Sequence, residues 1–228
     1  MSSVDPSRPH EVGQALAWHG RLMVLGWGVL APLAVLTARF YKILPGQNWP
    51  QTLDHRGWWH LHWITQSVVI VLALGALALI LAAMRHPDAP LHRVIGYCVL
   101  ILGATQYLSG FLRGSKGGPT DKTLRGDHFD MTRRRIAFEK LHKSLGYGVL
   151  ALTMAATLSG LWATNAPLWM PLLLTAFWVA LIVGFVVLQR RGQAVDTYQA
   201  IWGPDPQLPG NKIAPIGWGI TRPEPKGD

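Results

Sequence analysis

The chain has 228 residues, half of them apolar and only 14% charged, with 11 tryptophans and a formal net charge of +9. This composition excludes an ordinary soluble domain of the same length, in which about a quarter of the residues are charged. The lone Cys98 excludes both a disulfide framework and a C-x-x-C-H site for covalent haem attachment.

Five long apolar segments follow one another, at residues 22–38, 61–84, 94–112, 144–163 and 168–188. Each has about the 17 to 25 residues that a helix needs to cross a bilayer. The segments are apolar on every face, so we expect them to contact lipid. They predict an all-α integral membrane bundle of five transmembrane helices. We expect an extramembrane segment at 1–17, a transmembrane domain at 18–190 and a tail at 191–228. The alternative is a large soluble helical bundle.

The basic residues are distributed unevenly between the two sides of this bundle. One side collects 17 lysines and arginines, and the other side has only Arg8, Arg21, Arg85 and Arg93. Basic residues gather on the cytoplasmic side of membrane proteins. The asymmetry therefore places the N-terminus outside and the C-terminus in the cytoplasm, and it explains the net charge without nucleic-acid binding. We expect a multi-pass protein of a bacterial inner membrane.

Four of the nine histidines open predicted spans, in chain order His19, His62, His92 and His142. Ionisable groups in spans are rare and indicate function. Spans one and three start outside, whereas spans two and four start inside. His19 and His92 therefore share the outer level and His62 and His142 the inner level. Two such pairs are what two six-coordinate, non-covalent b-type haems would require. No catalytic residue is assigned.

Glycines and arginines near these histidines are further candidates for haem contacts. Gly96 and Gly146 follow His92 and His142 by four residues, where a side chain would meet a porphyrin edge. Haem propionates need cationic partners at the membrane surface. These could be Arg39 and Arg113 inside, and Arg21, Arg85 and Arg93 outside.

The remaining histidines lie in or near loops, and we interpret them as solvated residues without a ligand role: His10, His55, His60, His86 and His128. His60 and His62 point about 200° apart on a helix, so only one can face the bundle centre. The His62 stripe continues through small residues, which favours it. It contains Gln66, Val69, Ala73 and Ala76, whereas the His60 stripe contains Ile64, Ser67, Val71 and Leu74.

Several motifs in this order resemble the cytochrome b561 family, in particular the branch often fused to DOMON domains. They are HGRLMVLGWGVLAPLAVLTARFYK from His19, WWHLHWITQ around His62, HRVIG at His92 and HKSLG at His142. The resemblance covers roughly residues 15–190. It implies two haems b with two histidine ligands each, and one-electron transfer between a donor and an acceptor on opposite sides of the membrane.

The resemblance leaves partners and some alternatives open. No extramembrane DOMON domain is recognised, so a separate periplasmic protein or a small molecule could exchange the electrons. A quinone-linked cytochrome b anchor for a dehydrogenase uses the same chemistry. A haem-free transporter or structural membrane protein is the alternative from another class. The sequence leaves open whether the protein is an enzyme or an electron carrier, and whether it forms a homodimer.

Overall fold

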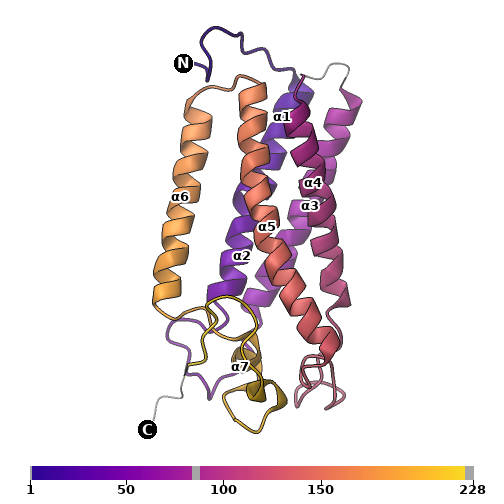
Figure 1. Ribbon diagram of the computed structural model, residues 1–228, viewed down its shortest axis with the longest axis vertical. Coiled ribbons are helices and arrows are strands. Elements are labelled where there is room, and N and C mark those ends of the chain that lie inside the picture. Colours follow the sequence, from indigo (N-terminus) through magenta and orange to yellow (C-terminus); the bar gives the residue numbers. More distant parts are fainter. Residues whose placement is uncertain (1, 84–87, 224–228) are drawn as a thin grey trace. The chain divides into compact units, whose positions relative to one another are not determined.

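The computed structural model describes residues 2–83 and 88–223. Arg85, a candidate for a haem contact, and His86 lie outside these ranges. Within the described residues, five helical stretches are long and apolar enough to cross a membrane, which confirms the predicted fold class. They are α1 to α2 (Gln14–Met23, η1 Val24–Leu30, Ala31–Phe40), α3 (Gly57–Ala82), α4 with η2 (Pro90–Ser109, Gly110–Leu112), α5 (Arg133–Ala163) and α6 (Trp169–Arg190). Figure 1 labels the long α-helices.

Large apolar side chains remain exposed on these helices. Val71 is 68% exposed on α3, Ile101 is 65% exposed on α4 and Leu172 is 60% exposed on α6. In water such a surface would aggregate, whereas in a bilayer it contacts lipid at no cost. The exposure pattern is therefore that of helices embedded in lipid.

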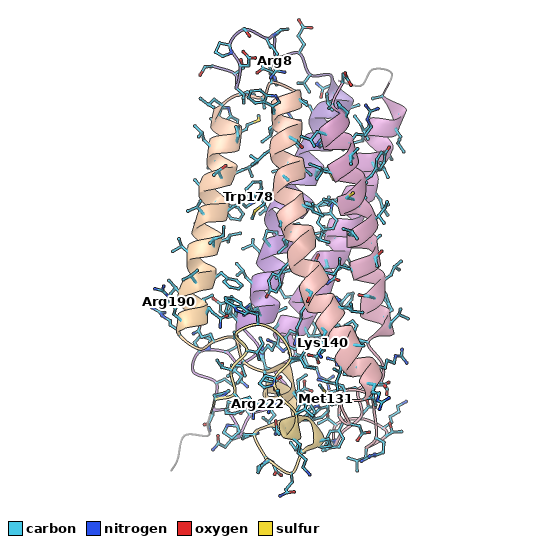
Figure 2. All side chains as sticks on the ribbon, in the orientation of Figure 1. Arg8, Met131, Lys140, Trp178, Arg190 and Arg222 are labelled. Carbon is cyan, nitrogen blue, oxygen red and sulfur yellow. The ribbon has the colours of Figure 1, made fainter. Side chains whose placement is uncertain are left out.

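The first span contains a π-helix of seven residues, Val24–Leu30, between α1 and α2. Ala31 N–H donates to Gly26 O, five residues earlier. The indole of Trp178, labelled in Figure 2, donates to Gly28 O at 2.8 Å. Such a segment widens a helix locally, and a side chain from another helix satisfies the backbone there.

The chain divides into two compact units. The first comprises Met1–Ala34, Ile64–Thr105 and Tyr147–Gly184. In it the N-terminal segment is tied to the connection between α5 and α6. Val4 N–H donates to Ala166 O at 2.9 Å, and the buried Asn165 side chain donates to Arg8 O at 2.6 Å.

The second unit comprises Val35–Trp63, Gln106–Gly146 and Phe185–Asp228. Its core contains residues from the connection after α4 and from the tail: Phe129, Met131, Tyr198, Ile201, Trp202 and Ile216. The tail forms α7 (Thr197–Trp202), every residue of which is buried. Asp196 caps this helix and accepts a 2.8 Å bond from Arg222, labelled in Figure 2. The tail thus contributes a buried helix to the core of the second unit.

The interpretation of His128 as a solvated loop residue is wrong. This imidazole is 5% exposed and contacts the rings of Tyr198 and Trp202, with centroids 5.9 and 6.0 Å away. Burial, reinforced by the nearby Arg135, lowers the pKa of His128 to about 3. The ring is therefore a neutral part of the second unit's core.

Candidate functional site

The first unit brings His19 on α1 and His92 on α4 together. Their ring centroids are 6.2 Å apart, and the rings are almost perpendicular, at 88°. Both residues are half-buried. The two histidines that were predicted to share one membrane level therefore lie side by side within one compact unit, with their rings perpendicular.

Backbone carbonyls determine which ring nitrogen of each histidine carries the proton. His19 Nδ1 lies 3.0 Å from Ala76 O on α3, and His92 Nδ1 lies 2.9 Å from Ala156 O on α5. A carbonyl oxygen only accepts, so each Nδ1 must be the protonated nitrogen. In the neutral imidazole, Nε2 then keeps its lone pair and can bind a metal.

The second unit brings His62 on α3 and His142 on α5 together. Their ring centroids are 6.4 Å apart at an interplanar angle of 74°. His142 Nδ1 contacts Ser109 Oγ at 3.1 Å, and its backbone carbonyl accepts a 2.7 Å bond from Gln106 Nε2. Both partners lie on α4, which therefore holds α5 at the turn that carries His142.

The spacing within both pairs fits two axial ligands of one haem iron. An imidazole nitrogen binds a first-row metal ion at about 2 Å, so imidazoles on opposite sides of one ion have ring centres roughly 6 Å apart. Within residues 2–83 and 88–223, no group of three or more His, Cys, Asp or Glu could hold a metal ion. Two imidazoles suit a cofactor that supplies its own equatorial ligands better than a bare tetrahedral ion.

The glycines near the histidines differ in what surrounds them. A Cβ added to Gly96 meets no atom within 4 Å, so packing within the protein does not account for this glycine. At Gly146 the added atom would lie 3.1 Å from Gln106 Nε2, so this glycine leaves room for the amide that bonds to His142 O. At Gly160 on α5 it would lie 2.8 Å from His92 Cε1. Gly160 therefore lets α5 approach that imidazole closely.

The two arginines proposed for propionates have different surroundings. Arg39 is 7% exposed and donates to Gln189 Oε1 at 2.6 Å and to Trp218 O at 2.7 Å, which ties α2 to α6 and the tail. The Arg113 guanidinium lies 3.9 Å from the centroid of the Trp59 ring. Burial, together with Arg135, lowers the pKa of Arg113 from its ordinary value.

The predicted faces of α3 are confirmed. Val69, Ala73 and Ala76 are 0 to 3% exposed, whereas Val71 and Leu74 on the His60 stripe are 68% and 59% exposed. His60 itself is exposed and accepts a 3.3 Å bond from Trp63 Nε1. The ligand role of His62 stays a prediction.

Sequence reasoning missed Ser109, Gln106 and Gly160. A glutamine within an apolar span is a signal that could have indicated Gln106. Ser109 and Gly160 have no such signal, because serines and glycines are common in packed membrane helices.

Comparisons with known proteins agree with the motifs. A family model described as eukaryotic cytochrome b561 matches residues 18–166. An Arabidopsis thaliana protein described as a cytochrome b561, DM13 and DOMON domain-containing protein is 25% identical over 147 residues, which are 64% of this chain and 14% of that protein. Two Arabidopsis cytochrome b561 and DOMON domain-containing proteins are 32% and 30% identical over 102 and 146 residues. These matches cover 43% and 63% of this chain and 23% and 27% of the relatives.

The matched part of the chain thus spans less than a third of each of these relatives. No solved structure matches. The relatives are plant proteins, so they lend no support to a bacterial membrane as the location. The family match over most of the chain and the five spans together show that this protein is a multi-pass membrane protein of the cytochrome b561 family, a family of b-type haem proteins.

Proposed function

We propose that the chain binds two haems b, one between His19 and His92 and one between His62 and His142, and passes single electrons from one side of the membrane to the other. The observation that supports this proposal is the spacing and the hydrogen bonding of the imidazole rings. Two pairs have ring centres 6.2 and 6.4 Å apart, and in the first pair both Nδ1 atoms face carbonyl oxygens. Nε2 is thereby left as the nitrogen available to iron.

When bound, the haems would supply one-electron chemistry at iron. The chain's own residues would do the rest. Ala76 O and Ala156 O would orient the first imidazole pair, and α4 would orient His142 through Ser109 and Gln106. A hydrogen bond from the imidazole nitrogen that does not bind the metal fixes the ring orientation and raises the basicity of the ligand.

Other contacts belong to the same proposal. Gly96 would accept a porphyrin edge, because it lies one turn after His92 and is half-buried, yet nothing in the protein lies within 4 Å of a Cβ built there. Arg113, which is half-buried beside Trp59, would pair with a propionate of the haem in the second unit. Arg39 stays a weaker candidate, since its hydrogen bonds already hold the tail.

The test is an optical and magnetic spectrum of the purified full-length protein, with haem counted per chain after extraction with acidified solvent. We expect two low-spin haems, both released by the solvent because no thioether holds them. One haem per chain would contradict the second site. None, with the chain folded, would favour the transporter alternative. Quinone-dependent shifts of the spectrum would favour the anchor for a dehydrogenase.

A further inference from the structure

The Ser109 hydroxyl lies at the centre of a short chain of hydrogen bonds in the second unit. Ser109 Oγ donates to Gln106 O at 2.7 Å, one turn earlier on α4. It also contacts His142 Nδ1 at 3.1 Å. Gln106 Nε2 in turn donates to His142 O at 2.7 Å. Two residues of α4 therefore contact both the ring and the backbone of one histidine.

The single proton of the Ser109 hydroxyl determines which group donates in each of these hydrogen bonds. A hydroxyl has one proton, and Gln106 O can only accept, so the proton of Ser109 goes to that carbonyl. The contact with His142 must then have Nδ1–H as the donor and Oγ as the acceptor. The bonds run from His142 Nδ1–H to Ser109 Oγ–H to Gln106 O. A hydroxyl that already donates is a better acceptor, because successive bonds polarise one another.

In the first unit, the histidine Nδ1–H groups donate to different acceptors. His19 and His92 donate to the backbone carbonyls of Ala76 and Ala156. A carbonyl is present whatever the side chain, whereas the partner of His142 is a hydroxyl that one substitution removes. The two histidine pairs therefore differ: the acceptor of the His142 Nδ1–H group is a side chain that a substitution can remove.

We propose that Ser109 is a positioning residue that fixes the Nδ1–H tautomer of His142 and lowers the midpoint potential of the haem held by His62 and His142. The proposal rests on the proposed function. An acceptor at Nδ1–H makes the imidazole a stronger electron donor, which favours ferric over ferrous iron. Removing the acceptor should therefore raise the potential of this haem and leave the other unchanged.

The experiment is a spectroscopic redox titration of the full-length protein and three variants. Ser109→Ala removes the hydroxyl, and Ser109→Thr keeps it. Thr105→Val is the matched control, because Thr105 also lies on α4 and its hydroxyl bonds to Ile101 O at 2.8 Å, but the residue is exposed. Haem per chain and the low-spin signal are measured on each sample.

In Ser109→Ala we expect one of the two potentials to rise, with the wild-type value restored in Ser109→Thr and both values unchanged in Thr105→Val. Loss of one haem from Ser109→Ala, with retention by Ser109→Thr, supports the same role, since such partners change metal affinity by about 10 to 100-fold. Unchanged potentials in a Ser109→Ala protein that keeps both haems, failure of the threonine to rescue, or the same shift in Thr105→Val overturns the proposal. A wild-type protein without bis-histidine haem overturns the proposed function instead.

Discussion

Replacing Glu139 by glutamine should destabilise the second unit strongly, because this carboxylate lies between two cations. Arg135 Nε donates to Glu139 Oε1 at 2.9 Å and Lys143 Nζ donates to Oε2 at 2.7 Å, all within the first turns of α5. The side chains of Arg135 and Glu139 are only 10% and 5% exposed. A glutamine has one acceptor oxygen, so it can serve one cation while its NH₂ group faces the other.

The expected loss follows from the burial. Breaking a buried ion pair costs about 3 to 5 kcal/mol, because a charge is left desolvated without a partner. For a chain of this length each kcal/mol lowers the midpoint by about 2 to 4 °C, so we expect a fall of about 6 to 20 °C. The assay is thermal unfolding in detergent micelles, followed by tryptophan fluorescence and near-ultraviolet circular dichroism.

The control for this experiment is Arg125→Gln, which removes a cation paired with Asp130 at 3.2 Å but 79% exposed. Exposed pairs contribute about 0 to 1 kcal/mol, so its midpoint should stay within about 4 °C of the wild type. A Glu139→Gln protein that melts together with this control would refute the reasoning that the buried trio stabilises the second unit.

Three further predictions follow from other parts of the chain. Burial, with repulsion from Lys143 and Arg39, lowers the pKa of Lys42 to about 7, while its Nζ donates to Arg39 O and Val195 O. The folded state therefore binds fewer protons than the unfolded state between about pH 7 and pH 10. The free energy of unfolding should rise with pH across this window. Lys42→Met should remove that rise, on the order of a few kcal/mol, from a pH series of melting curves, and an unchanged slope would contradict the assignment. Gly160→Ala places a Cβ 2.8 Å from His92 Cε1 and should perturb the spectrum of one haem. Gly148→Ala, whose added Cβ meets nothing within 4 Å, should leave both haem spectra unchanged. Equal spectra for the two variants would refute this role of Gly160. A reporter active only in the periplasm, fused after Asp228 in a bacterial host, should be silent, and activity would reverse the predicted orientation.

The membrane fold could be predicted because hydropathy is a local property. Apolar runs of sufficient length, such as the one that became α6, identify their own span, and the small residues below His62 identify the buried face of α3. The sequence also indicated the histidine pairs, since span direction places their partners at one level.

Other features depend on contacts that no local pattern encodes. The segment that became α7 has no apolar periodicity, and it is buried only because residues 129–131 and the tail pack around it. His128 was predicted to be solvated because no local pattern indicates its contacts with Tyr198 and Trp202. Helix α5 begins at Arg133, eleven residues before its apolar run, and in this added stretch Glu139 forms ion pairs with both Arg135 and Lys143. Ser109 acquires its role only through α5, which lies far away in sequence.

The most direct test of the account is which histidine substitutions remove the same haem. His19→Ala and His92→Ala are each expected to abolish one spectral component, and His62→Ala and His142→Ala the other. His60→Ala, on the exposed face of α3, should keep both components and serves as the matched control. The proposed pairing is wrong if His19→Ala and His62→Ala remove the same component, or if His60→Ala loses a haem that His62→Ala retains.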